Sequence, residues 1–243
     1  MKKLMIVAGI MLLSLNISLA QKKVNPRIPL IGSEVPSFKA QSTNGQLSFP
    51  KDFGTNWKIV FSHPRNFTPV CSSEILELAY QQKEFKALNT EIIVVSTDEL
   101  EAHHDWKAAL EEIKFKGRDA VKINFPLVED KSYVIANSFG MLDSYSSTAV
   151  QSIRGVFFID PENKVRAFYF YPNEVGRNVE EIKRTLVALQ TNYNDSKVML
   201  PANWQLGEDV MVPYLDDTQK DTQGNPLLPY YKVAWFMTYK QAK

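Results

Sequence analysis

The chain has 243 residues, of which 44% are hydrophobic and 23% are charged, and its formal net charge is +1. This hydrophobic content is sufficient for a large buried core and excludes an intrinsically disordered chain. A near-neutral chain without a basic block has no electrostatic basis for binding nucleic acid or an anionic membrane surface. We therefore expect its partners to be small molecules or proteins.

Residues 1–20 have the three parts of a secretory signal peptide: Lys2 and Lys3, an apolar stretch, and small residues ending at Ala20. We expect cleavage after Ala20 and export to the periplasm or the outside of the cell. A retained membrane anchor is the alternative, but the apolar stretch is short for spanning a bilayer and contains polar residues such as Asn16. After cleavage we expect no membrane span.

The next two segments, residues 21–34 and 35–191, differ in composition and in hydrophobic pattern. Residues 21–34 are polar and contain two prolines, which predicts an extended N-terminal arm. From residue 35 to 191, short apolar runs alternate with helical patterns, which predicts one α/β domain. Strands are expected at 58–62, 91–96, 125–128, 153–159 and 164–171, and helices at 69–88, 97–113, 132–139 and 178–191.

Three of these strands indicate how the sheet is arranged. The strand at 91–96 is β-branched almost throughout, which predicts a central position buried on both faces. The strands at 153–159 and 164–171 are separated by the turn-forming residues 160–163, which predicts an antiparallel hairpin. The order of elements is typical of a thioredoxin-like fold, with a mixed central sheet flanked by helices.

Residues 192–243 form a further segment in which prolines are spread through polar sequence. An aromatic cluster lies near its end, at Tyr230, Tyr231, Trp235, Phe236 and Tyr239. We interpret this segment as a C-terminal extension without an independent core. Many aromatic side chains with little periodicity indicate docking onto another surface, either of the same subunit or of a second copy.

Cys71 is the only cysteine of the chain and lies where the strand 58–62 leads into the helix 69–88. Unpaired backbone N–H groups and the positive end of the helix dipole at such a junction favour a thiolate. One cysteine cannot form an internal disulfide, although export normally favours disulfides. An inert, packed thiol is the alternative, but this position indicates a nucleophile.

Thr68 and Pro64 precede Cys71 in a way that indicates a built site. Thr68 is expected to cap the helix, with Pro69 as its first residue, and this places the hydroxyl and the sulfur at the same mouth. Pro64 limits the freedom of the loop and removes an N–H group. A hydroxyl that both donates and accepts suits a substrate with two adjacent oxygens, such as a peroxide, although Thr68 as a cap alone is also consistent with the sequence.

The run His63-Pro64-Arg65-Asn66-Phe67-Thr68-Pro69-Val70-Cys71 resembles the Pro-x-x-x-Thr-x-x-Cys signature of the peroxiredoxins, in the form typical of the one-Cys subfamily. The resemblance spans nearly the whole chain. The segment around Arg154 is similar to the family strand that supplies the active-site arginine, and Gly176-Arg177-Asn178 is similar to a family helix start. The segment from Pro201 to Pro213 is similar to the C-terminal domain of one-Cys members.

The resemblance implies a thiol-dependent peroxidase that reduces hydrogen peroxide and organic hydroperoxides through a Cys71 sulfenic acid. It implies that Arg154 stabilises the thiolate and polarises the peroxide, that Thr68 holds the O–O unit, and that His63 hydrogen-bonds near the sulfur. Arg177 is expected either to support the site or to form a salt bridge at a helix start. Arg154 pairing only with a carboxylate is the alternative for that residue.

The same resemblance implies how the enzyme is recycled. Because no second cysteine is present, an external thiol of unknown identity must reduce the sulfenic acid. No metal, flavin or haem is implied, and a homodimer or a higher oligomer is expected. A thiol–disulfide oxidoreductase is disfavoured because it needs two cysteines, whereas a holdase chaperone or assembly protein on the same scaffold remains the alternative function.

Overall fold

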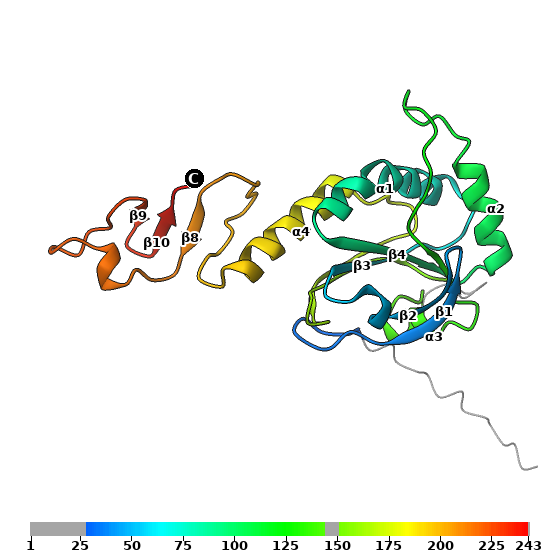
Figure 1. Cartoon of the computed structure of the whole chain (residues 1–243), viewed down its shortest axis with the longest axis horizontal. Coiled ribbons are helices and arrows are strands. Elements are labelled where there is room, and N and C mark those ends of the chain that lie inside the picture. The colour runs from blue at the N-terminus through cyan, green and yellow to red at the C-terminus, as the bar shows by residue number, and fades with distance from the viewer. Residues whose placement is uncertain (1–27, 144–150, 243) are drawn as a thin grey trace, which may run out of the picture.

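A seven-stranded β-sheet with the strand order β2-β1-β5-β4-β3-β6-β7 runs through the main part of the molecule (Figure 1). The structure is a computed structural model and describes residues 28–143 and 151–242. The strands of this sheet are β1 (Phe38–Ser42), β2 (Gly45–Phe49), β3 (Trp57–Ser62), β4 (Thr90–Ser96), β5 (Leu127–Glu129), β6 (Arg154–Ile159) and β7 (Val165–Tyr171). The helices are α1 (Pro69–Ala87), α2 (Leu100–Leu110), α3 (Val134–Ser138) and α4 (Val179–Asn194), with 3-10 turns at η1 (Lys51–Phe53) and η2 (Asp217–Gln219).

The sheet is mixed, as the sequence predicts. Strand β4 pairs in parallel with β3 and β5, whereas β6 pairs antiparallel with both β3 and β7. β4 is the fourth strand of the seven, which confirms the central position expected from its β-branched residues. The thioredoxin-like α/β architecture is therefore confirmed.

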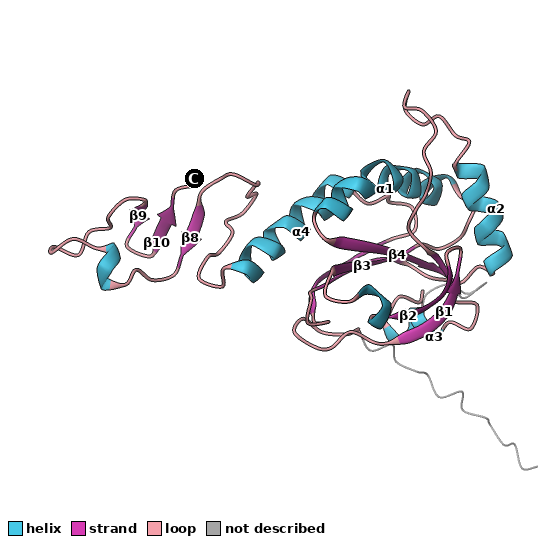
Figure 2. Cartoon of the chain, in the orientation of Figure 1, coloured by secondary structure: helices cyan, strands magenta, loops and turns pink. Residues whose placement is uncertain are grey.

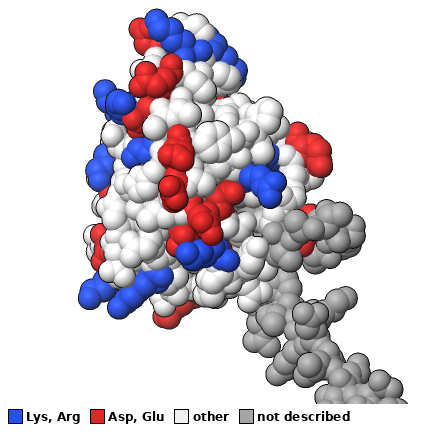
Figure 3. Space-filling view, turned by 90° about the vertical axis from the view of Figure 1, so that its right-hand side faces the viewer, with Lys and Arg blue, Asp and Glu red and all other residues white. Residues whose placement is uncertain are grey.

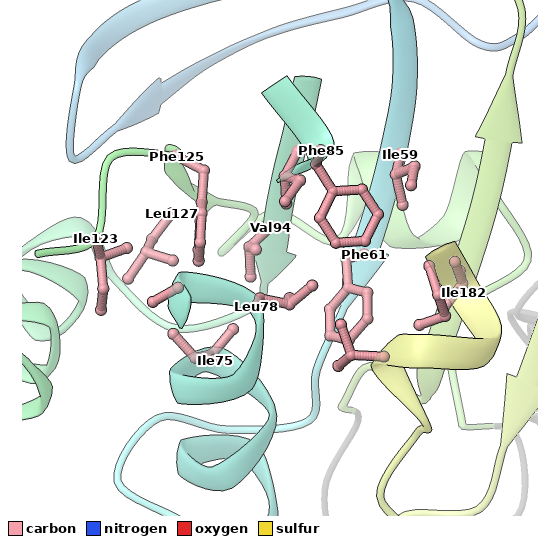
Figure 4. Close-up of a cluster of buried hydrophobic side chains, with 14 of the residues drawn as sticks. Ile59, Phe61, Ile75, Leu78, Phe85, Val94, Ile123, Phe125, Leu127 and Ile182 are labelled. Atoms are coloured by element: carbon pink, nitrogen blue, oxygen red, sulfur yellow. The ribbon is translucent and has the colours of Figure 1, made fainter. Parts of the chain in front are cut away.

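Alternating residues of the central strands face two separate apolar clusters. Ile59, Phe61 and Val94 point into a cluster with side chains of α1, α2 and α4 (Figure 4). Their neighbours Val60 and Ile93 point to the opposite face, where α3 supplies Ile135 and Ala136. Burial on both faces explains the near-continuous apolar sequence of β3 and β4, and Figure 2 shows helices on both sides of the sheet.

Two local features differ from the sequence prediction. The hairpin of β1 and β2 was not expected as a pair of strands in the region after residue 35. Helix α2 begins at Leu100, with Glu99 at the N-cap position and no side-chain capping bond, rather than at Thr97. The reason is that the Asp98 carboxylate accepts hydrogen bonds from Ser96 Oγ and from the backbone N–H of Asn66, so it holds a loop instead of starting a helix.

The C-terminal segment forms a small sheet of its own at the far end of α4 (Figure 1). Its strands, in the order β8-β10-β9, are β8 (Val210–Val212), β10 (Met237–Lys240) and β9 (Tyr230–Ala234). Helix α4 runs through Asn194, so the expected boundary at residues 191 and 192 falls within its last turn. Trp204 is buried, and its carbonyl accepts from Arg184 of α4, which attaches the start of the segment to the α/β domain.

The surface and the helices of the described residues are consistent with the composition. On the face shown in Figure 3, acidic and basic side chains are interspersed among uncharged ones. No helix in residues 28–143 and 151–242 is both long enough and apolar enough to cross a membrane. The predicted signal peptide, and residues 21–27 of the predicted arm, lie outside the described residues.

Candidate active site

Cys71 lies in the first turn of α1 and is fully buried as a free thiol. Pro69 is the first helical residue, as expected, and Thr68 occupies the N-cap position with an extended backbone (φ −102°, ψ 146°). The first turn of α1 contains no acidic residue. The unpaired N–H groups and the helix dipole at this end therefore act on the sulfur without a competing carboxylate in the same turn.

The guanidinium of Arg154 contacts the sulfur directly. Its Nη1 lies 3.3 Å from Cys71 Sγ, and the side chain is 3% exposed. Arg154 is the first residue of β6, and its Nε and Nη2 donate to the carbonyl of Asn173 at 3.0 and 2.7 Å. These bonds fix the plane of the guanidinium, so a positive charge is held beside the sulfur before any substrate arrives.

Glu74 links the two arginines expected at the site. It lies one helical turn after Cys71, is 3% exposed, and accepts from Arg154 Nη1 at 2.7 Å and from Arg177 Nη2 at 2.8 Å. The sequence analysis missed Glu74. The available signal was its position three residues after Cys71 on a predicted helix, which places a carboxylate on the same face as the sulfur.

The charges of this buried group leave one positive charge in excess, since two arginines face one carboxylate. Buried charges require partners because removing them from water is costly. A thiolate at Cys71 would add the one negative charge that balances this group. The carboxylate partner that the sequence analysis kept as an alternative for Arg154 is thus present together with the contact to sulfur.

Arg177 joins the elements that surround the site. Its side chain is fully buried, and its Nη1 donates to the carbonyls of Ser62 and Gly155 at 2.7 and 2.8 Å. The guanidinium stacks on Phe61, with 3.3 Å between its central carbon and the ring centroid. Burial lowers the pKa of Arg177, while the hydrogen bonds to Glu74 raise it. Arg177 hydrogen-bonds Glu74 and forms no hydrogen bond to the Cys71 sulfur, so it supports the residues that contact the sulfur.

Thr68 and Pro64 lie on the loop that leads into α1. The hydroxyl of Thr68 donates to the carbonyl of Arg65 at 2.9 Å, and no side-chain capping bond is present. The residue therefore holds the N-cap position without capping through its side chain. Pro64 is buried, as expected for a shielding residue, and Phe67 between them has a left-handed backbone (φ 55°) and is 60% exposed.

His63 is fully buried, and among the described residues it does not form the hydrogen bond near the sulfur that the family resemblance implies. Its ring lies 4.9 Å from that of Trp106, measured between centroids. Neither ring nitrogen has a hydrogen-bond partner among the described residues, although the backbone of Arg65 lies close enough to raise the pKa of His63 slightly. Burial, with His103 and the two site arginines, holds that pKa well below its usual range, so the ring is neutral.

The two adjacent histidines of α2 face different surroundings, as neighbouring residues on a helix do. His103 is fully buried, whereas His104 is exposed. Within residues 28–143 and 151–242, no group of three or more histidine, cysteine, aspartate or glutamate side chains is placed to hold a metal ion.

Comparison with known sequences gives one family. Residues 31–168 match the AhpC/TSA family. A peroxiredoxin of Methanosarcina mazei is 43% identical over 217 residues, which cover 88% of this chain and 98% of that protein. A peroxiredoxin of Thermotoga petrophila is 36% identical over 219 residues, with the same two coverages.

Comparison with solved structures agrees. The yeast mitochondrial 1-Cys peroxiredoxin, described in connection with thiol resolution through the glutathione and thioredoxin systems, is 30% identical with a TM-score of 0.76 and covers 88% of this chain and 100% of its own. A cysteine-to-serine mutant of peroxiredoxin 6 of Arenicola marina is 28% identical with a TM-score of 0.73 and covers 88% of this chain and 98% of its own.

Proposed function

Because this chain belongs to the AhpC/TSA family and is a peroxiredoxin, a thiol-dependent peroxidase, we propose that Cys71 is the residue that attacks the peroxide. The observation that carries this proposal is the 3.3 Å contact between Arg154 Nη1 and Cys71 Sγ inside a buried group with one excess positive charge. Such a setting favours the thiolate, which is the nucleophilic form of cysteine.

The reaction begins when the thiolate attacks the terminal oxygen of a hydroperoxide. The S–O bond forms as the O–O bond breaks, and the electron pair of that bond leaves on the second oxygen. Sulfur is thereby oxidised to the sulfenic acid, and the attacked oxygen keeps its hydrogen. The departing oxygen takes a proton from solvent and leaves as water or as an alcohol.

Three groups are suited to stabilise this transition state. The fixed guanidinium of Arg154 faces the negative charge that moves from sulfur toward the leaving oxygen. The first backbone N–H groups of α1 point toward the same end of the helix. Thr68, whose hydroxyl hydrogen is directed at the Arg65 carbonyl, offers its oxygen as an acceptor for the O–H of the peroxide. Interactions that strengthen as charge develops lower the barrier more than they tighten substrate binding.

Recycling is proposed to use an external thiol, since Cys71 is the only cysteine of the chain. A first thiol displaces water from the sulfenic acid and forms a mixed disulfide, and a second thiol releases Cys71 as the thiol. Glutathione and thioredoxin are the first reductants to test, because the similar yeast protein is described with these systems. Without a reductant, excess peroxide oxidises the sulfenic acid further to the sulfinic acid.

A homodimer is the proposed assembly, and its support lies in the C-terminal segment. The segment exposes large apolar side chains that a soluble monomer ordinarily covers, namely Leu206 (75%), Tyr214 (89%), Leu228 (82%), Val233 (63%), Trp235 (88%) and Phe236 (66%). A second copy of the chain is the partner that we propose for this surface, since most soluble oligomers are built from identical subunits.

The division of the chain and its location are proposed from the sequence. Residues 1–20 are proposed as a cleaved signal peptide, 21–34 as an arm, 35–191 as the peroxidase domain and 192–243 as the dimerisation segment. Export to the periplasm or the outside of the cell follows from the signal-peptide pattern alone. Mass spectrometry of the protein purified from its native cells, with Gln21 as the expected first residue, tests the cleavage.

The proposed function is tested by a single-turnover reaction of the purified protein with hydrogen peroxide. Cys71 oxidation is followed by intact mass and by a sulfenic-acid trap, and rapid stoichiometric trapping supports the proposal. Oxidation no faster than that of free cysteine contradicts it. In that case protection of a client protein from aggregation, unchanged in Cys71→Ser, would favour the holdase alternative that the exposed apolar tail supports.

A further inference from the structure

One face of α2 contacts the chain on both sides of Cys71. His103 and Trp106, which lie three residues apart on that face, are both buried. Nδ1 of His103 lies 3.0 Å from the amide nitrogen of Asn66, in the loop before Cys71. Nε1 of Trp106 donates to the hydroxyl of Ser72, the residue after Cys71, at 3.2 Å. The proposed mechanism leaves α2 without a role, although α2 is the element that makes both contacts.

The hydrogen bond between Asn66 and His103 has a defined donor and acceptor, and both side chains are buried away from water. Asn66 is 4% exposed and His103 is fully buried. An amide nitrogen donates only, so Nδ1 of His103 is the acceptor and the imidazole is neutral. Burial lowers the pKa of His103, and this outweighs the opposing effects of Asp98, the Val128 backbone and Glu129. A neutral acceptor is therefore available at neutral pH.

Asn66 transmits this contact to the loop that carries Thr68. Its backbone N–H donates to Asp98 Oδ2 at 2.8 Å, so the residue is held through both its main chain and its side chain. The next residue, Phe67, has the left-handed backbone that turns the chain toward α1. The Thr68 hydroxyl closes the turn on the carbonyl of Arg65, which precedes Asn66. A shift of Asn66 therefore moves Thr68.

We infer that His103 is a positioning residue for the peroxidase reaction: through Asn66 it fixes the loop of residues 64–68 and, with it, the Thr68 hydroxyl at the start of α1. This inference rests on the proposed role of Cys71 and Thr68. His103 does not touch the sulfur or the substrate. Its contribution is the geometry of the hydroxyl, and small displacements of a positioned group are costly to a reaction rate.

The test compares two reactions of the same sulfur in the full-length mature protein. Oxidation by hydrogen peroxide depends on the positioned hydroxyl, whereas alkylation by iodoacetamide depends on the thiolate and its accessibility. His103→Leu removes the acceptor, and His103→Asn keeps a side-chain oxygen close to the position of Nδ1. His104→Leu, at the exposed neighbouring residue, is the matched control.

We expect His103→Leu to slow oxidation by roughly 10- to 100-fold while alkylation stays close to the wild-type rate. His103→Asn recovers most of the oxidation rate, and His104→Leu matches the wild type. Adding His103→Leu to Thr68→Val causes little further loss, because the hydroxyl that His103 positions is then already absent. If His103→Leu does not fold, Asn66→Ala cuts the contact from the loop side and is expected to give the same selective loss.

Several results overturn the inference. An unchanged oxidation rate in a folded His103→Leu or Asn66→Ala variant removes the positioning role. Equal losses in oxidation and alkylation assign His103 a purely structural role, and so do fully additive losses with Thr68→Val. Wild-type oxidation no faster than that of free cysteine is a separate outcome, because it contradicts the proposed function itself. The wild-type rate is therefore measured before any variant is made.

Discussion

The guanidinium of Arg154 lies between two side chains of one helix, with its Nη1 3.3 Å from Cys71 Sγ and 2.7 Å from Glu74 Oε2. The sulfur and the carboxylate are three residues apart on α1, so a single helical turn sets both distances. In the proposed mechanism, the arginine therefore acts on the sulfur from a position that Glu74, together with the Asn173 carbonyl, sets. This relationship makes the carboxylate as important to test as the arginine.

Glu74→Gln is expected to destabilise the protein strongly and to slow peroxide oxidation. The change leaves Arg154 and Arg177 buried without a carboxylate, and breaking a buried pair in this way costs about 3–5 kcal/mol. Chemical denaturation measures the loss of stability, and a single-turnover reaction measures the rate. Glu77→Gln on the same helix is the control, because its partly exposed pair with Arg118 contributes only about 0–1 kcal/mol. Similar effects of the two changes would contradict the account of Glu74.

Arg154→Lys is expected to slow oxidation of Cys71 by roughly 100-fold while the protein stays folded, since one misplaced electrostatic donor costs this much in other active sites. An ammonium group keeps the charge but lacks the planar fork that contacts the sulfur, Glu74 and the Asn173 carbonyl together. Rapid mixing with hydrogen peroxide measures the rate. Arg166→Lys, on the neighbouring strand β7, is the control, and a rate near that of the wild type in Arg154→Lys would argue that charge alone is sufficient.

Stability is expected to fall as the pH is lowered through the ordinary histidine range. The pKa of His63 in the folded protein is well below 6.5, because burial disfavours the charged ring. Below pH 6.5 the unfolded chain therefore binds a proton that the folded chain does not, and the free energy of unfolding decreases by up to about 1.4 kcal/mol per pH unit for this group.

Replacing that ring removes its share of the pH dependence. His63→Phe is expected to show a shallower decrease in unfolding free energy between pH 6.5 and 5 than the wild type, measured by urea denaturation at several pH values. His104→Phe, at an exposed position, keeps the full slope. An equally steep slope in His63→Phe would show that the buried ring does not carry the effect.

The aromatic pair at the turn between β9 and β10 is expected to be essential for dimer formation. Trp235 and Phe236 are 88% and 66% exposed and lie 5.2 Å apart between ring centroids. The double change Trp235→Ala with Phe236→Ser should convert the proposed dimer to a monomer at low micromolar concentration, measured by light scattering after size exclusion. Val134→Ser, at an exposed apolar position on α3, should leave the mass unchanged. An unchanged mass in the double variant would move the interface elsewhere.

The sequence predicted those parts of the fold that depend on local pattern. Strand β4, the hairpin of β6 and β7, and the start of α1 at Pro69 follow from β-branched runs, a turn and a Thr-Pro pair, and each is present. The start of α2 was misplaced because Asp98, a residue type that often caps helices, instead accepts a hydrogen bond from the backbone N–H of Asn66, 32 positions earlier in the chain. A local pattern carries no information about such a partner.

The candidate site shows the same limit. Cys71 and Arg154 were predicted and lie in contact, but Arg154 came from a resemblance to a family, not from local physics. Glu74 was missed because a glutamate on a helix is ordinarily a solvated surface residue. Only the arrival of two arginines from β6 and from the turn before α4 makes it a buried counter-charge.

The partners of the site are distant in the sequence: Cys71 and Arg154 are 83 positions apart, and Glu74 and Arg177 are 103 positions apart. An unfolded chain therefore holds the sulfur without its guanidinium, without its helix and in water, where it is an ordinary cysteine. If Cys71 reacts as proposed, rapid reaction with peroxide requires that β6 has paired with β3. The oxidation rate would then be a direct reporter of native structure, and a newly made chain would react with peroxide no faster than any other thiol until the sheet has closed.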